Sequence, residues 1–144
     1  MASVKFNRQE FEKHIKITDE VIEKIQLFGI PVESLTEDEI IIEVLPNRPD
    51  LLSFQGFIRA LKAYLGKETG IKKYPVIKSG YRLIADKSLP NEWPYCVACI
   101  VKDISLNNEK IKEIINIQEK LGTTLLRNRK KGGLGVYPLD KISF

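Results

Sequence analysis

The 144-residue chain has little histidine and cysteine, and it has no long apolar run. His14 is the only histidine, and Cys96 and Cys99 are the only cysteines, so the chain has no second cysteine pair to complete a zinc site, which needs three or four ligands. No apolar run approaches the ~20 residues of a membrane span, and the N-terminus lacks the apolar core of a signal peptide. We therefore expect a cytoplasmic protein with no membrane partner and no metal site.

The two cysteines have the C-x-x-C spacing of redox and metal sites. Residues 95–101 are nearly all apolar and predict a strand, in which side chains three apart point to opposite faces. The thiols of Cys96 and Cys99 would then not meet, so we interpret both as core residues. No nucleophile stands at an identifiable spacing from His14, which we interpret as a surface or interface histidine. No catalytic residue is predicted.

Charge is divided unevenly along the chain. Residues 1–60 hold 7 basic and 11 acidic side chains, whereas residues 61–144 hold 16 basic and 8 acidic ones. A basic half suits a polyanionic partner, although a solvated lysine-rich surface is the alternative.

The densest basic cluster consists of Arg127, Arg129, Lys130 and Lys131, four cations within five residues. Such a cluster can follow an RNA phosphate backbone, where it contributes affinity and not sequence choice. These four are our candidate RNA-binding residues, and a solvated loop is the alternative. The same field could be extended by three further lysines, Lys72, Lys73 and Lys141.

A stiff corner is predicted by the run Pro46, Asn47, Arg48, Pro49 and Asp50. Each proline fixes its own φ near −65° and keeps the preceding residue out of the helical region. We expect a strand to stop at Pro46 and a helix to begin no earlier than about Pro49. We interpret the corner as architectural, with Asp50 capping the helix and Arg48 pairing with a nearby carboxylate. Contact with RNA or a partner chain is the alternative.

Apolar periodicity predicts two short helices, a hairpin and a third helix before Gly66. The first helix covers residues 7–14, and the second starts at an N-cap, Thr18, and stops at Gly29. Residues 31–35 and 40–44 flank a polar link of hairpin length. The third helix is expected to bury one stripe of side chains: Leu51, Phe54, Phe57, Ile58, Leu61 and Leu65.

The pattern changes after a lysine-rich boundary at residues 67–79. Strands are predicted at residues 81–86, 95–101 and 133–139, the second of them buried on both faces. Between the last two strands, Asn107 or Asn108 is expected to cap a helix with an apolar stripe from Ile111 to Leu121. The glycine-rich stretch at residues 132–135 lacks the order of a phosphate-binding loop and is interpreted as a turn.

Four segments of the chain resemble, in the same order, the beta chain of archaeal and eukaryotic phenylalanyl-tRNA synthetase. They are VKFNR (4–8), EVLPNRPDLLSFQGFIRALKAYLG (43–66), PYCVACIVKDISL (94–106) and IQEKLGTTLLRNRKKGGLGVYPLDKI (117–142). The resemblance implies an α+β fold. It consists of a small winged-helix-like N-terminal domain (residues 1–70) and the first, truncated part of a mixed α/β editing domain (71–144). Because chains of that family continue for several hundred residues, an N-terminal fragment is expected.

The resemblance also implies a function. The family's α2β2 ligase attaches phenylalanine to its tRNA with ATP and Mg²⁺, and its beta chain hydrolyses mischarged tyrosyl-tRNA. Editing has a physical reason, because an apolar pocket rejects an added hydroxyl by a factor of only ~10². The family's editing and metal-binding residues lie beyond Phe144, so we expect no cofactor and no activity in this chain alone. It would have a structural and tRNA-binding role beside the alpha chain. The alternatives are a stand-alone RNA-binding or adaptor module and a purely structural piece.

Overall fold

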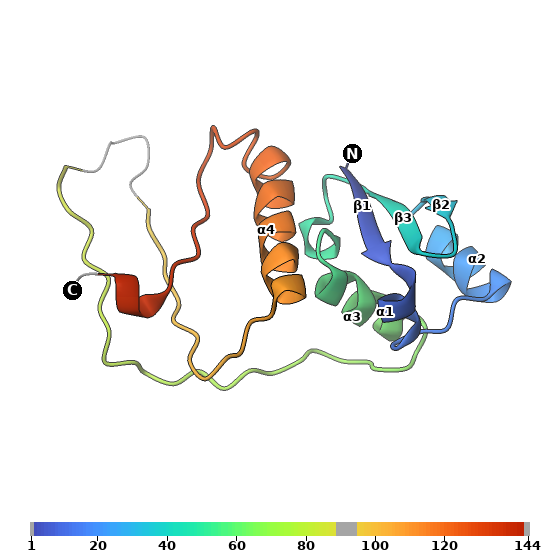
Figure 1. Ribbon diagram of the computed structural model, residues 1–144, viewed down its shortest axis with the longest axis horizontal. Helices are drawn as coiled ribbons and strands as arrows, with labels where there is room; N and C mark the ends of the chain where they lie inside the picture. Colours follow the sequence, from blue (N-terminus) through green and yellow to red (C-terminus); the bar gives the residue numbers. More distant parts are fainter. Residues whose placement is uncertain (1, 89–94, 143–144) are drawn as a thin grey trace.

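A three-stranded sheet packs against three helices, and a fourth helix lies beside this unit (Figure 1). The computed structural model describes residues 2–88 and 95–142. In chain order the elements are β1 (Ala2–Asn7), α1 (Arg8–Glu12), α2 (Asp19–Leu27), β2 (Val32–Leu35), β3 (Glu39–Val44), the 3-10 turn η1 (Pro49–Leu51), α3 (Phe54–Tyr64), α4 (Asn108–Thr123) and the 3-10 turn η2 (Leu139–Lys141). The mixed α+β class predicted from the sequence is confirmed.

The sheet has the strand order β1-β3-β2, and both pairings are antiparallel. The hairpin of β2 and β3 was predicted, and Val32 pairs with Ile42 in it. The strand β1 was missed, although it pairs with β3 over its whole length, from Ala2 opposite Val44 to Asn7 opposite Glu39. Only two of its side chains, Val4 and Phe6, are buried, so its alternation gives a short signal.

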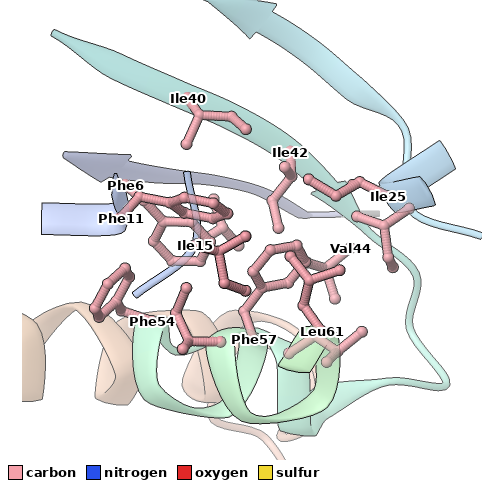
Figure 2. Close-up of a cluster of buried hydrophobic side chains, with 14 of the residues drawn as sticks. Phe6, Phe11, Ile15, Ile25, Ile40, Ile42, Val44, Phe54, Phe57 and Leu61 are labelled. Atoms are coloured by element: carbon pink, nitrogen blue, oxygen red, sulfur yellow. The ribbon is translucent and has the colours of Figure 1, made fainter. Parts of the chain in front are cut away.

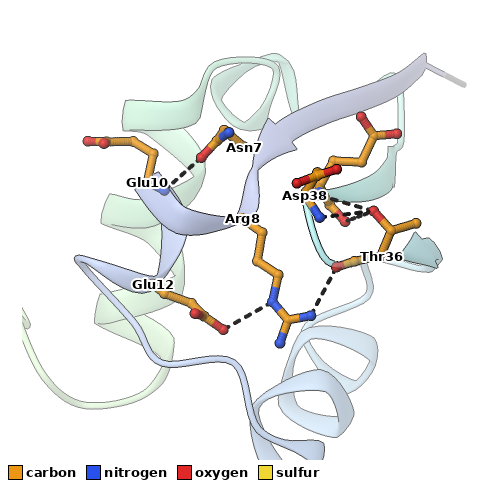
Figure 3. A network of polar contacts seen from close by, with 7 residues as sticks. Asn7, Arg8, Glu10, Glu12, Thr36 and Asp38 are labelled. Carbon is orange, nitrogen blue, oxygen red and sulfur yellow. Dashed lines mark hydrogen bonds and ion pairs between the residues drawn. The ribbon is translucent and has the colours of Figure 1, made fainter.

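The first two helices are capped by side chains. Asn7 Oδ1 accepts a hydrogen bond from the Glu10 amide at 2.9 Å, and α1 ends at Glu12, two residues before the end of the predicted helix. Thr18 Oγ1 caps α2 as predicted, and Gly29 ends that helix with φ at +85°. Arg8 joins α1 to the hairpin, because it donates to Glu12 Oε1 at 3.2 Å and to the Thr36 carbonyl at 2.9 Å (Figure 3).

A hydrophobic core fills the space between the sheet and α3 (Figure 2). Phe6 from β1 meets Phe54 and Phe57 from α3, with ring centroids 5.4 Å apart in both pairs. The predicted stripe is buried along η1 and α3, except that Leu65 lies at the margin of the core. Among the described residues, every buried hydrophobic side chain lies between Val4 and Leu61.

The second half of the chain departs from the prediction. The expected strands at 81–86, 95–101 and 133–139 are wrong, because these segments pair with no other strand among the described residues. Burial of the second strand on both faces is also wrong, since Val97 is 94% exposed. Cys96 and Cys99 are free and exposed, so they are not core residues. A strand is stabilised by hydrogen bonds to a neighbouring strand, and no described strand lies beside these segments.

The helix α4 was predicted at the right place. Asn107 Oδ1 caps it by accepting from the Lys110 amide at 2.9 Å. Near its other end, Lys120 Nζ donates to the carbonyl of Ser3 at 2.7 Å, and Leu121 packs against the core. The helix therefore sits against the open edge of β1. In residues 2–88 and 95–142, every helix is too short or too polar to cross a bilayer.

Candidate nucleic-acid interface

The corner between β3 and α3 holds five of the predicted site residues. The strand ends at Val44, as expected, and η1 starts at Pro49. The α-helix proper starts later than expected, at Phe54, with Ser53 Oγ accepting from the Gly56 amide at 3.0 Å. The expectation that Asp50 caps the helix is therefore wrong. The 3-10 turn inserts between the prolines and the helix and moves the cap to Ser53.

The carboxylate that pairs with Arg48 is that of Asp50. The guanidinium donates from Nε to Oδ1 at 3.0 Å and from Nη2 to Oδ2 at 2.9 Å. These hydrogen bonds from Arg48 lower the pKa of Asp50, against the opposing effect of burial. The Arg48 guanidinium also lies 5.2 Å above the ring of Phe28, which follows α2. Both contacts of Arg48 are internal, and they favour the architectural interpretation of the corner.

A close backbone contact holds the corner against α3. A Cβ atom added to Gly56 would lie 1.9 Å from the carbonyl oxygen of Asp50. Real Cβ atoms do not approach backbone so closely, so any larger residue here would push η1 away from the helix. Sequence reasoning missed this role. The available signal was a glycine inside a strongly amphipathic helix, where glycine is unfavourable.

The basic cluster forms a tight turn after α4, which we call the basic turn (residues 124–131). Its backbone folds back onto the helix end, since the Leu126 amide donates to the Leu121 carbonyl at 3.0 Å and the Arg129 amide to the Gly122 carbonyl at 2.8 Å. Three consecutive residues, Arg127, Asn128 and Arg129, have left-handed φ values of +49°, +55° and +62°. For residues with a Cβ this conformation costs ~1 kcal/mol or more each. The turn therefore depends on compensating contacts.

The four predicted RNA-binding cations have different surroundings. Arg129 forms an ion pair with Glu119 of α4, and its side chain crosses Gly122. Arg127, Lys130 and Lys131 are exposed, and their side chains have no hydrogen bond or ion pair with another described residue. The structure brings the four together on one turn, yet it leaves three of them open to an external anion.

The other lysines of the predicted field lie elsewhere. In Figure 1 the red turn η2, which includes Lys141, and the green chain after α3, which includes Lys72 and Lys73, are apart from the end of α4 where the basic turn begins. Lys72 Nζ instead lies 5.6 Å from the ring centre of Tyr74. The candidate interface is therefore the basic turn alone.

A hollow of about 240 Å³ lies between the corner and the end of α4. Its walls contain no titratable side chain, and they are formed by Ala2, Val44, Leu45, Pro46, Pro49, Leu52, Thr123, Thr124 and Leu125. This hollow offers no acid or base for chemistry. Within the described ranges, no three His, Cys, Asp or Glu side chains gather as a metal site would require. His14 is half-buried and lies edge-on to the ring of Phe54 at 5.6 Å.

No family model matches the chain. Beta subunits of archaeal phenylalanine–tRNA ligase are similar over most of it. The subunit from Sulfolobus acidocaldarius is 43% identical over 132 residues, covering 90% of this chain and 24% of the relative. Those from Methanocella arvoryzae and Archaeoglobus fulgidus are 39% and 36% identical, over 99% and 88% of this chain and 26% and 23% of the relatives. This chain belongs to the phenylalanine–tRNA ligase beta-subunit family.

The fold agrees with that membership. A crystal structure of an N-terminal fragment of the phenylalanyl-tRNA synthetase beta subunit from Pyrococcus horikoshii matches with a TM-score of 0.86 and 28% identity. The match covers 98% of this chain and 43% of that fragment. The chain spans about a quarter of the length of the curated beta-subunit relatives described above.

Proposed function

We propose that this chain serves a phenylalanine–tRNA ligase as a structural and tRNA-binding part of its beta subunit. The observation that carries the proposal is the basic turn, with three exposed cations that have no partner among the described residues. We infer that the polyanion bound by the turn is tRNA, since the names of the relatives specify a ligase that acts on tRNA. Contacts of this kind to phosphate give affinity without sequence choice.

The whole-enzyme chemistry is part of the same proposal. The ligase would attach phenylalanine to tRNA with ATP and Mg²⁺, as an α2β2 assembly with the synthetase alpha chain, in the cytoplasm. Editing of tyrosyl-tRNA would belong to residues outside this chain. We propose that the chain by itself neither aminoacylates nor edits. Release of tyrosine from mischarged tRNA by the purified chain would contradict this.

The binding proposal is tested by measuring tRNA affinity as a function of salt. For each phosphate contact, log K should fall against log[salt] with a slope of about −0.7 to −0.9. Replacing Arg127, Lys130 and Lys131 together by Gln should therefore reduce the magnitude of the slope by roughly 2 to 3. A slope that stays the same would overturn the proposed interface.

A matched control separates a local site from net charge. Lys16, Lys67 and Lys78 are exposed, and no side-chain ion pair joins them to another described residue. Replacing these three by Gln changes the net charge by the same amount. The control should leave most of the slope in place, whereas equal losses in both triple variants would indicate binding without a defined site.

The alternative of a stand-alone RNA-binding module makes a different prediction about partners. A ligase component should co-purify with the phenylalanine–tRNA ligase alpha chain when both are expressed together, and a stand-alone module should not. Light scattering on the purified complex would give its stoichiometry. Binding of tRNA without any alpha-chain association would favour the module.

A further inference from the structure

We propose that Arg129 positions the basic turn and that its phosphate contacts come from Arg127, Lys130 and Lys131. This inference rests on the tRNA-binding role proposed above. It assigns to Arg129, Glu119 and Gly122 the task of holding a strained turn in one shape, and we call these three residues the clamp.

The backbone of the basic turn is strained. Three successive residues with side chains occupy the left-handed region, which a free loop would leave. Two backbone hydrogen bonds hold these residues in the left-handed region. The Asn128 amide donates to the Thr123 carbonyl at 3.3 Å, and the Arg129 amide donates to the Gly122 carbonyl at 2.8 Å. The same bonds satisfy carbonyls that the end of a helix leaves without partners.

The side chain of Arg129 ties the turn to α4. It runs back along α4 to Glu119 and forms an ion pair there. On the way it covers Gly122, where an added Cβ would lie 3.2 Å from Arg129 Nε and 3.3 Å from its Cγ. Gly122 is buried in this way although its part of the chain has no core. The absence of a side chain at position 122 therefore gives Arg129 its path.

The clamp leaves three cations of the basic turn free. The side chains of Arg127, Lys130 and Lys131 are exposed, whereas the guanidinium of Arg129 already has a carboxylate partner. A turn that is fixed before binding loses less conformational freedom when phosphates arrive. The clamp would therefore raise tRNA affinity although none of its members touches RNA.

Removing Glu119 distinguishes this role from the obvious alternative. If Arg129 were a phosphate contact, Glu119→Ala would release it, and tRNA affinity and the salt slope would both rise. If Arg129 positions the turn, the same variant should bind tRNA about 3- to 10-fold more weakly, although its net charge rises by one. The two interpretations therefore predict opposite signs.

The matched control is Glu109→Ala. Glu109 lies at the start of the same helix and pairs with Lys112 at 3.3 Å, so its removal makes the same charge change away from the basic turn. This variant should bind tRNA as well as the parent chain or slightly better. Tighter binding in both variants would overturn the clamp.

A second measurement tests the clamp without RNA. Amide hydrogen exchange of Asn128, Arg129 and Lys131 in the full chain should accelerate at least about 5-fold in Glu119→Ala and stay unchanged in Glu109→Ala. Arg129→Lys, which keeps the charge and loses the planar fork, should accelerate exchange as well. Unchanged exchange in the first and third variants would contradict the clamp. If exchange responds while the parent chain shows no salt-dependent tRNA binding, the clamp stands and the proposed function fails.

Discussion

The two parts of the chain, residues 2–66 and 67–142, both contain many apolar side chains, but they differ in how far these side chains are buried. In the first part, sixteen hydrophobic side chains are buried around α3 and the sheet. In the described residues of the second part only Gly122 is buried, and several large apolar residues are almost fully exposed, among them Ile71, Val76, Tyr95 and Val97. Apolar composition alone therefore does not make a core; the segments must also find surfaces to cover them.

The helix α4 shows which kind of secondary structure forms in the second part, where the described residues form no core. The hydrogen bonds of a helix are made within the segment, whereas those of a strand need a second strand. Asn107 supplies a cap, and α4 forms on the local signal. Residues 95–101 have the more apolar sequence, yet they stay unpaired in the described chain. The helix forms because its hydrogen bonds are local, whereas residues 95–101 form no strand because a strand needs non-local hydrogen bonds.

The largest contrast should come from truncating an aromatic side chain in each part. Phe57 is fully buried in the core, so Phe57→Ala should lower the free energy of unfolding by about 3–5 kcal/mol. Tyr95 is 93% exposed, so Tyr95→Ala should change it by less than about 0.5 kcal/mol. Chemical denaturation measures both. A large loss in Tyr95→Ala would mean that the second part is packed in solution.

The next contrast concerns two glycines. Gly56→Ala forces a methyl group onto the Asp50 carbonyl, and we expect a loss of roughly 1–3 kcal/mol or more, despite the better helix propensity of alanine. A Cβ at Gly80 would meet nothing within 4 Å, so Gly80→Ala should be close to neutral. Thermal unfolding followed by circular dichroism compares them. Equal melting temperatures would show that the corner can move away from α3.

A smaller effect is expected from the helix caps. Ser53→Ala removes the cap of α3 and should cost about 1 kcal/mol of global stability. Asn107→Ala removes the same kind of cap from α4, which contributes little to the core. The second variant should lose helical signal without shifting the main unfolding transition. A shared shift would indicate that α4 unfolds together with the first part.

The smallest effects should appear with pH, and they should have opposite signs in the two parts. Arg48 lowers the pKa of Asp50, so its ion pair stabilises the corner fully above pH 3.8 and loses this contribution as pH falls through the lower folded-state pKa. Because both side chains are partly exposed, the contribution should stay below about 1 kcal/mol. Asp50→Asn should remove it, and acid titration of the melting temperature measures the difference.

On α4 the sign is reversed. Burial raises the pKa of Glu113 above 4.5, and the charge of Glu10 on α1 adds to the shift, while Glu113 Oε1 is buried without a hydrogen-bond partner among the described residues. The docked helix therefore binds the proton more tightly than the free one. Docking should be strongest below pH 4.5 and weaken as pH rises through the folded-state pKa. Protection of the α4 amides from hydrogen exchange should therefore decrease with rising pH in the parent chain. In Glu113→Gln this pH dependence of protection should be absent.

Much of the first part could be predicted because its signals are stiff and local. Pro46 and Pro49 ended the strand and delayed the helix, and Thr18 and Gly29 marked the ends of α2. The cap of α3 was misplaced because η1 uses 3-10 hydrogen bonds, which no residue type specifies. The strand β1 was missed because its pairing with β3 spans about forty residues.

For the candidate site, the sequence predicted only which cations take part and not how they are arranged. The run of cations at residues 127–131 is visible in the sequence, and the structure does place it on one turn. The sequence does not show that Arg129 is paired whereas the other three cations are free. The ion pair of Arg129 with Glu119 depends on left-handed backbone, which residues other than glycine rarely adopt. Gly122 was the available hint, since a glycine near the end of a helix often permits close approach.

The position of β1 at one side of β3 also bears on the order in which the chain acquires its shape. Its first paired residue, Ala2, can pair only once Val44 has been made, and closing so long a loop is slow compared with closing the three-residue link between β2 and β3. During synthesis β1 would leave the ribosome before β3, and the two strands could pair only after β3 had followed. Until then, Val4 and Phe6 would be open to chaperones.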